Sequence, residues 1–456
     1  MKANKKADTV WDVVVIGGGP AGMMAAGRAA ERGRSVLLLE KNPTLGKKLL
    51  ATGGGRCNVT NGKIEIRTML AQYKGNGQFL FSAFSQFSVQ DTLNFFNRRG
   101  MATKVEAEGR VFPVSNKAQS VWDVLVRYMK EGDVRIQTGA AVTGLSLDAV
   151  TKHVSIRLKD TTEIRAQSCV VATGGASRPE TGSSGEGFIW LKKIGHTIID
   201  TSGALVPIAL TDAWAKKISG VTLKDIKLTV FQSPEYVEGQ NGQKQEVSAK
   251  GGSAVRLSST LSDQTEGSSP SKSSGGQEGK LLFTHVGISG PTVLNMSKEV
   301  GEMLQYGEVT IALDLFPKLD SGALKRELQT LLIAESNKKL KNTLRKLIPA
   351  ALVGALLELA NINGETANHS VRHEDRIKLV ALAKAIPLHV KGLLGADKAV
   401  VSSGGVALKE VNFKTMQSRL APNLYVIGDV LNIDRPSGGY SLQLSWTTGF
   451  VAGSNS

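Results

Sequence analysis

The sequence predicts an α/β fold in which both ends of the chain form one domain around a parallel sheet, with a β-rich insertion and a small helical domain between them. Three features predict this fold. A β-branched run, a glycine-rich loop and an alanine-rich helix follow one another near the N-terminus. Strand-like alternation and then helical periodicity fill the middle of the chain. A last strand and a last helix, each beside glycines, lie near the C-terminus.

The first predicted element is a strand, Trp11–Ile16, which is apolar and rich in β-branched residues. A glycine-rich loop ends it, and an alanine-rich helix follows through Met23–Glu31. A second buried strand, Ser35–Leu39, leads directly to Glu40. This strand–loop–helix–strand unit of about 30 residues is the smallest dinucleotide-binding unit.

A meander of short strands is predicted next. A further buried strand, Cys169–Ala172, follows it and ends in Thr173-Gly174-Gly175. We expect a meander between parallel strands in the large FAD-binding variants of the Rossmann fold. Its strands are predicted at Val134–Gln137, Ala141–Leu147, Val154–Leu158 and Thr162–Ala166.

The middle of the chain changes to alternating strands, followed by helices. The stretch Gln240–Glu278 is too polar to offset its ordering entropy, so we expect a mobile surface loop there. Leucines at helical spacing predict helix over Ser321–Leu359, and Arg372–Ala385 is a second amphipathic helix. Strands are predicted at Ile226–Gln232, Gly279–Phe283, Glu308–Leu313 and Leu424–Ile427. The expected domains are residues 1–205 (N-terminal part of the nucleotide-binding domain), 206–318 (β-rich insertion), 319–386 (helical domain) and 387–456 (return strands and C-terminal part).

The composition is that of a globular protein with excess positive charge. The 456 residues include 56 Lys and Arg against 40 Asp and Glu, which gives a net charge of +16. Such a field attracts anionic partners, but only 5% of residues are aromatic and no RNA-binding motif is present, so charge alone does not predict nucleic-acid binding. Two cysteines, the absence of a long apolar run and the lack of a secretory apolar region predict a cytoplasmic protein that crosses no membrane. The oligomeric state stays open.

The strongest motif is Gly17-x-Gly19-x-x-Gly22 with Glu40. Gly17 permits a tight turn, Gly19 lets the backbone approach a pyrophosphate, and Gly22 allows the helix to pack closely on the strand, while the helix N-terminus attracts phosphates. Glu40 is placed to accept hydrogen bonds from ribose hydroxyls. These residues predict a dinucleotide site without distinguishing FAD from NAD. The predicted contacts also include Pro20, Ala21, Lys41, Val142, Thr173 and Gly174.

A second contact region near the C-terminus favours FAD. In Tyr425–Asp429, backbone N–H groups around Gly428 can face phosphate oxygens, and the Asp429 carboxylate can accept a ribityl hydroxyl. The helix that begins at Gly438, Gly439 and Tyr440 would direct its N-terminus at the flavin pyrimidine edge and stabilise negative charge on the reduced ring.

A third cluster is Thr52–Asn58, with three consecutive glycines. Such a run suits a flat ring that lies against backbone, and Arg56 and Asn58 offer hydrogen-bond donors. Cys57 is a candidate redox-active thiol, and the alternative is a packing role because no partner cysteine is nearby.

Four strings carry a family resemblance when taken in order with Tyr425–Gly453. The chain resembles the bacterial FAD-binding flavoprotein family that includes aminoacetone oxidase and the bile-acid-inducible flavin reductase, over essentially its whole length apart from Gln240–Glu278. The strings are LLATGGGRCNVTN (Leu49–Asn61), VATGGASRPETGSSGEG (Val171–Gly187), GKLLFTHVGISGP (Gly279–Pro291) and SSGGVALKE (Ser402–Glu410).

The resemblance implies a discontinuous, glutathione-reductase-like, Rossmann-type FAD-binding domain, an inserted β-barrel-like domain and a small helical domain. It also implies that Gly54, Arg56, Cys57 and Asn58 lie by the isoalloxazine. Two departures concern the second contact region: Asp429 stands where the family more often has Glu, and the following loop, 432–437, is a variant of an acidic-then-glycine loop.

His285 is the candidate catalytic acid–base residue. It lies between a strand and a glycine turn, and imidazole titrates near neutral pH. The alternative is a structural histidine. The other five histidines show no shared ligand spacing, so no metal site is predicted. No P-loop and no GxSxG elbow is present, which excludes NTPase and serine-hydrolase chemistry.

The predicted function is an FAD-dependent oxidoreductase that transfers a hydride between a small organic substrate and flavin N5, with electrons passed to oxygen or another acceptor. The chain has no second complete dinucleotide motif, so NAD(P)H would have to act as a transient electron donor at the flavin itself. Two alternatives stay open: an RNA-modifying flavoenzyme, suggested by the net charge, and a non-catalytic FAD-binding protein.

Overall fold

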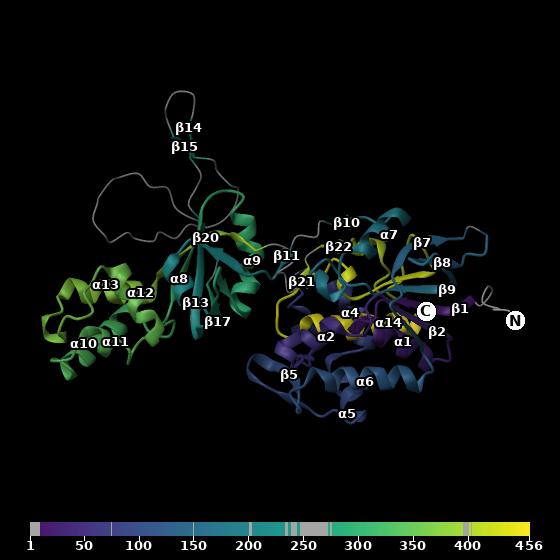
Figure 1. Ribbon diagram of the computed structural model, residues 1–456, viewed down its shortest axis with the longest axis horizontal. Coiled ribbons are helices and arrows are strands. Elements are labelled where there is room, and N and C mark those ends of the chain that lie inside the picture. The colour runs from purple at the N-terminus through teal and green to yellow at the C-terminus, as the bar shows by residue number, and fades with distance from the viewer. Residues whose placement is uncertain are drawn as a thin grey trace. The chain divides into compact units, whose positions relative to one another are not determined.

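The computed structural model describes residues 10–73, 75–148, 150–199, 203–232, 236–238, 244–246, 272–273, 276–394, 401–402 and 404–456. The chain divides into two compact units, Met1–Ala204 with Ala396–Ser456, and Leu205–Gly395 (Figure 1). Both chain ends therefore belong to one unit. Most of the loop predicted at Gln240–Glu278 lies outside the described residues.

The first unit is built on a seven-stranded sheet. Its parallel part has the order β6-β2-β1-β9-β23, and β8 and β7 extend it in antiparallel fashion from β9. At its centre, Val15 pairs with Leu38 on one side and with Val170 on the other. This topology confirms the predicted Rossmann-type α/β domain. The strands are β1 (Val10–Ile16), β2 (Val36–Glu40), β6 (Arg135–Thr138), β7 (Val142–Leu147), β8 (Val154–Leu158), β9 (Glu163–Val171) and β23 (Leu424–Val426).

One strand differs from the sequence-based expectation. Instead of separate strands at Thr162–Ala166 and Cys169–Ala172, the structure has the single strand β9. Gln167 and Ser168 join the two halves without a glycine or proline, so the extended backbone continues. The last strand of the meander thereby becomes a strand of the parallel sheet, which pairs with β1 and β23.

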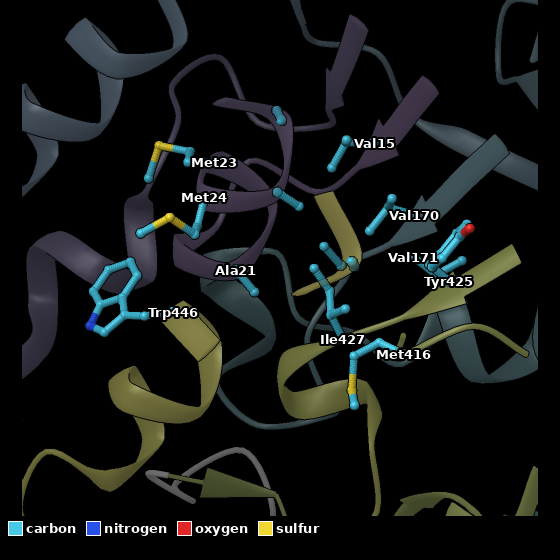
Figure 2. Close-up of a cluster of buried hydrophobic side chains, with 14 of the residues drawn as sticks. Val15, Ala21, Met23, Met24, Val170, Val171, Met416, Tyr425, Ile427 and Trp446 are labelled. Atoms are coloured by element: carbon cyan, nitrogen blue, oxygen red, sulfur yellow. The ribbon is translucent and has the colours of Figure 1, made fainter. Parts of the chain in front are cut away.

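The two ends of the chain share one core. Helix α1 (Pro20–Glu31) packs against α14 (Tyr440–Asn455) and α6 (Ala118–Glu131). Figure 2 shows side chains of this core, among them Met23 and Met24 of α1 and Trp446 of α14, all fully buried. The α1–α14 contact is close because α14 carries glycines there: a Cβ on Gly449 would lie 2.5 Å from the Ala21 carbonyl oxygen.

No element was predicted between Asn61 and Val134, but the described residues there form four α-helices and most of a small sheet. Ser88 caps α5 through a capping box with Asp91. The three-stranded sheet has the order β3-β5-β4. The elements are β3 (Thr60–Asn61), α3 (Ile66–Leu70), α4 (Gly77–Gln86), α5 (Val89–Arg98), β4 (Thr103–Val105), β5 (Arg110–Pro113) and α6.

The second unit contains a closed antiparallel barrel of six strands. The ring β13-β17-β18-β12-β20-β19 closes because β13 pairs with both β17 and β19, and β16 (Lys272–Ser273) adds to β13. This confirms the β-barrel-like domain that the resemblance implied. The barrel strands are β12 (Ile208–Leu210), β13 (Thr222–Gln232), β17 (Gln277–Phe283), β18 (Gly287–Ser289), β19 (Val309–Asp314) and β20 (Ile386–Leu393).

Helices complete the second unit. The predicted helical stretch Ser321–Leu359 is divided into three helices, the last of which begins directly after Pro349. Leu328 and Leu356 from this stretch are buried in the same hydrophobic cluster as Leu313 of the barrel. The helices of this unit are α8 (Ala213–Lys217), α9 (Pro291–Met303), α10 (Ser321–Ala334), α11 (Leu340–Leu344), α12 (Ala350–Ala360) and α13 (His373–Lys384).

Candidate cofactor-binding site

A cavity opens in the first unit where β1, β2, β9 and β23 reach their carboxyl ends. The empty space within it amounts to about 870 Å³, which includes open solvent. The carboxyl ends of parallel strands are where ligands bind in open α/β sheets. Of the residues predicted to contact the cofactor, the cavity is lined by Gly17, Gly19, Pro20, Ala21, Glu40, Lys41, Val142, Thr173, Gly174, Gly428 and Asp429.

The glycines of the first loop have different physical roles. Gly17 has φ +108°, and a Cβ on Gly22 would lie 1.9 Å from the Gly17 carbonyl oxygen, so these two glycines are required by the packing of the protein itself. A Cβ on Gly19 would meet no protein atom within 4 Å. Gly19 caps α1 and faces the cavity, which leaves room for a pyrophosphate at the helix N-terminus.

Glu40 ends β2 and is only 7% exposed. Its Oε2 accepts a hydrogen bond from the Gly18 N–H (2.8 Å), and its Oε1 accepts from both nitrogens of Asn42 (2.8 Å each). These bonds fix the carboxylate in the cavity wall. Since a carboxylate oxygen accepts more than one hydrogen bond, Glu40 can also take ribose hydroxyls. The glycine loop and this carboxylate fit the adenosine and pyrophosphate parts of FAD.

We expect Glu40→Gln to weaken FAD binding and to destabilise the protein by about 1–3 kcal/mol, because one amide N–H₂ would face a buried backbone N–H. Titration of the apoprotein with FAD, followed by flavin fluorescence, and thermal unfolding would measure the two effects. The partner variant Asn42→Ala removes donors but keeps the carboxylate, and we expect it to retain FAD. Equal losses in both variants would contradict a role for the Glu40 carboxylate in cofactor binding.

The other end of the cavity carries positive charge. Asp429 accepts a hydrogen bond from the buried guanidinium of Arg435, which also donates to the Ile433 carbonyl (2.6 Å). Lys48, on α2 (Lys47–Ala51), lines the cavity and donates from Nζ to the Ser177 carbonyl (2.8 Å). Burial lowers the pKa of the Lys48 ammonium, while the Asp429 carboxylate acts in the opposite direction. The ion pair with Asp429 neutralises Arg435, which is not among the cavity-lining residues, whereas the Lys48 ammonium in the cavity wall suits an anionic part of FAD.

Sequence reasoning missed Lys48 and Arg435. Lys48 directly precedes the string that begins at Leu49, and Arg435 lies in the 432–437 loop that departs from the family pattern. A cation next to a glycine-rich segment was the available signal for Lys48. For Arg435 no such signal was present, because the conformation of the loop between Asp429 and Arg435 decides whether the two side chains meet.

The glycine loop Thr52–Asn58 and the start of α14, which were predicted to flank the flavin, lie close together in the structure. The Trp446 indole N–H of α14 donates to the Val59 carbonyl (2.9 Å), and the Thr60 hydroxyl donates to Gln443 Oε1 (2.7 Å). A Cβ on Gly439 would lie 2.4 Å from the Thr60 backbone, so the start of α14 packs directly on β3. The glycine loop that precedes β3 therefore lies close to the start of the last helix, although about 380 residues separate them.

Several predicted contact residues lie outside the cavity lining, and their contact with the cofactor stays a prediction. Arg56 bonds Glu106 (2.5 Å) and Asn116 (2.6 Å), and Asn58 Oδ1 accepts from the Val111 N–H (3.1 Å), so both residues hold the loop to its neighbours. A Cβ on Gly54 (φ +66°) would meet nothing within 4 Å, which leaves open backbone there. Those outside the lining are Gly22, Gly54, Arg56, Cys57, Asn58, Gly438, Gly439 and Tyr440.

The two candidate catalytic residues also stay predictions. Cys57 is fully buried, and burial raises the pKa of its thiol to about 12, which describes a neutral, packed side chain. His285 is exposed in the turn between β17 and β18, where the Thr284 N–H donates to the Gly287 carbonyl. It belongs to the second unit, whereas the cavity belongs to the first.

Fold and site together define an FAD-dependent oxidoreductase. A family model described as the HI0933-like protein Rossmann domain matches residues 11–455. The chain belongs to this HI0933-like family.

Relatives along the whole chain carry two kinds of name. A 3-dehydro-bile acid delta(4,6)-reductase of Clostridium scindens is 30% identical over 96% of this chain and 97% of its own. A ribosomal RNA dihydrouridine synthase of Escherichia coli is 29% identical over 97% of this chain and 96% of its own. Among solved structures, a 3-ketosteroid delta1-dehydrogenase from Sterolibacterium denitrificans has a TM-score of 0.51 at 12% identity, covering 98% of this chain and 99% of that one, which supports the fold.

Within the described residues, no helix is both long enough and apolar enough to cross a membrane.

Proposed function

We propose that the protein reduces a carbon–carbon double bond conjugated with a carbonyl group, and that its substrate is a uracil ring in RNA. The observation that carries the proposal is the chemistry common to two full-length relatives with different names. A 3-dehydro bile acid has a ketone at carbon 3, and a delta(4,6) double-bond system is conjugated with it. Dihydrouridine is uridine with two hydrogens added across C5=C6, a bond conjugated with the C4 carbonyl.

The overall reaction balances with a nicotinamide donor. A hydride adds to the carbon β to the carbonyl and a proton adds to the α carbon, while NAD(P)H is oxidised to NAD(P)⁺. FAD, when bound, supplies the hydride-transfer chemistry between donor and substrate. In this proposal Glu40 and the Gly17–Gly19 loop would hold the adenosine and pyrophosphate, and the Lys48 cation in the cavity wall would offset phosphate charge.

Charge favours RNA over a small acid as the substrate. A net charge of +16 raises the local concentration of a polyanion and its association rate. The second candidate is a small unsaturated oxo acid, favoured by the 30% identity to the bile acid reductase. We place the protein in the cytoplasm, because both of its cysteines are buried and unpaired, as in a reducing compartment.

Anaerobic stopped-flow experiments with the FAD-loaded protein test the proposal. We expect NADPH or NADH to bleach the flavin, and a uridine-containing ribosomal RNA transcript to restore its colour with formation of dihydrouridine, detected by mass spectrometry. The control transcript has cytidine in place of uridine and should restore nothing. Reoxidation by a 3-oxo-4-ene steroid acid alone would select the second candidate. Reoxidation by neither substrate would refute the proposed bond type.

A further inference from the structure

A dense group of cations lies on the helical part of the second unit, between the end of α10 and the end of α11. Five basic residues fall within nine positions: Lys338, Lys339, Lys341, Arg345 and Lys346, here called the basic surface. The side chains of Lys338, Lys339, Lys341 and Lys346 are 59%, 57%, 37% and 55% exposed, and Arg345 is also exposed. On the second unit taken by itself, these cations are therefore accessible to a binding partner.

Two carboxylates hold the four lysines of the basic surface in place. Glu335, whose side chain is 10% exposed, pairs with Lys338 (2.8 Å) and with Lys346. Glu365 pairs with Lys339 (2.8 Å) and with Lys341. Hydrogen bonds from these lysines lower the pKa of each carboxyl group to about 2, so both remain ionised at physiological pH. The group keeps a net charge of about +3 in a fixed arrangement.

The backbone beneath the basic surface is fixed by a buried polar network. The fully buried Thr343 donates from its hydroxyl to Glu335 Oε2 (3.0 Å). Asn368, 4% exposed, donates to Thr343 Oγ1 (2.7 Å) and to the Glu335 carbonyl (2.8 Å). Such networks rigidify the segment that carries them. Ordered cations lose less side-chain entropy when they bind than free surface lysines do.

Arg345 differs from its neighbours. Within the described part of the chain it pairs with no carboxylate, whereas each of the four lysines does. An unpaired guanidinium beside an ordered set of ammonium groups suits the oxygens of successive phosphates, which Arg recognises in bidentate fashion.

We infer that the basic surface binds the phosphate backbone of the RNA substrate. This inference rests on the proposed function for the identity of the polyanion. Clusters of Lys and Arg of this length are typical of nucleic-acid contacts. Contacts to phosphates position an RNA without reading its sequence, so the basic surface contributes affinity and salt dependence.

The test compares two variants that remove equal charge. Lys339→Gln with Arg345→Gln removes two cations from the basic surface and leaves Lys341 on Glu365. Lys216→Gln with Lys217→Gln removes two exposed cations from α8 of the same unit. Binding is measured by fluorescence anisotropy of a labelled ribosomal RNA fragment at several salt concentrations, and thermal unfolding checks that both variants fold.

We expect the first variant to bind RNA roughly tenfold more weakly near 0.15 M salt, with a salt slope smaller by about two. The α8 variant should stay within about twofold of the unaltered protein. Equal weakening in both variants would overturn the inference, because net charge alone would then explain binding. Binding to anionic lipid vesicles but not to RNA would also overturn it.

The binding assay is independent of the proposed chemistry. A basic surface that binds RNA in a protein that forms no dihydrouridine would leave the inference standing and remove the proposed function. If the protein forms dihydrouridine but the Lys339/Arg345 variant binds RNA as well as the unaltered protein, the proposed function would stand and the inference about the basic surface would fall.

Discussion

Gly19→Val is expected to give a folded protein that does not retain FAD. Gly19 has φ −79° and ψ −178°, which a valine can adopt, and a Cβ there would meet no protein atom within 4 Å. The valine methyl groups would instead occupy the cavity at the N-terminus of α1, where we expect the pyrophosphate to bind. We expect the dissociation constant for FAD to rise roughly 100-fold or more, equivalent to about 3 kcal/mol. Absorbance of the purified protein and titration with FAD measure it.

The matched variant is Gly22→Val, three residues further on in the first turn of α1. A Cβ there would lie 1.9 Å from the Gly17 carbonyl oxygen, so this substitution should destabilise the fold by more than about 4 kcal/mol. The two glycines thus separate cofactor binding from folding. A yellow, FAD-saturated Gly19→Val protein would contradict the placement of the pyrophosphate.

Lys48→Met is expected to weaken FAD binding about 30-fold, equivalent to about 2 kcal/mol, because it removes a charged hydrogen-bond donor from the cavity. The apoprotein should remain folded, since Lys48 lies at the cavity wall and Met matches its length. Isothermal titration with FAD at pH 7 gives the affinity, and thermal unfolding of the apoprotein gives the stability.

The pH dependence supplies a second test with opposite signs for binding and folding. Burial lowers the pKa of Lys48 in the folded apoprotein below its ordinary value of 10.5. Between these two values the unfolded chain binds more protons, so the contribution of Lys48 to apoprotein stability increases as pH rises. FAD affinity should fall over the same alkaline range, because the neutral amine no longer attracts phosphate.

Lys48→Arg is the control for charge. It keeps a cation that does not titrate in this range, so we expect it to bind FAD nearly as well as the unaltered protein and to lose the alkaline fall in affinity. An alkaline fall that persists in Lys48→Arg would assign the titration to another group.

The sequence was informative where local chemistry has one dominant solution. The run from Trp11 to Glu40 combines a strand, a glycine loop, a helix and a terminal carboxylate, and the structure places these elements as expected. The barrel and the discontinuous Rossmann-type domain were also predicted, because the family resemblance spans nearly the whole chain. Such a resemblance indicates which distant segments belong to one domain, whereas periodicity describes only single helices and strands. No element was predicted between Asn61 and Val134, although α6 has 14 residues and buries Val121, Leu125 and Tyr128 at helical spacing. The sequence signal for this helix was therefore present but missed.

Local pattern also could not find the charges that complete the cavity. Lys48 lines the cavity on α2, which follows a left-handed glycine at Gly46. Arg435 is not among the lining residues and pairs with Asp429, which is, six residues earlier in the chain. The division of Ser321–Leu359 into separate helices was partly readable from the sequence, because Pro349 directly precedes α12.

The sequence by itself determined the nucleotide-binding unit, because phosphate binding by a helix N-terminus needs only neighbouring residues in a fixed order. FAD rather than NAD was indicated by the second contact region near the C-terminus and by the family resemblance. The tertiary structure alone decided which charged side chains share the cavity and that Glu365 pairs with Lys339 and Lys341 of the basic surface. The physical reason is that electrostatic interactions depend on distance in space, and sequence separation says little about distance once the chain is packed.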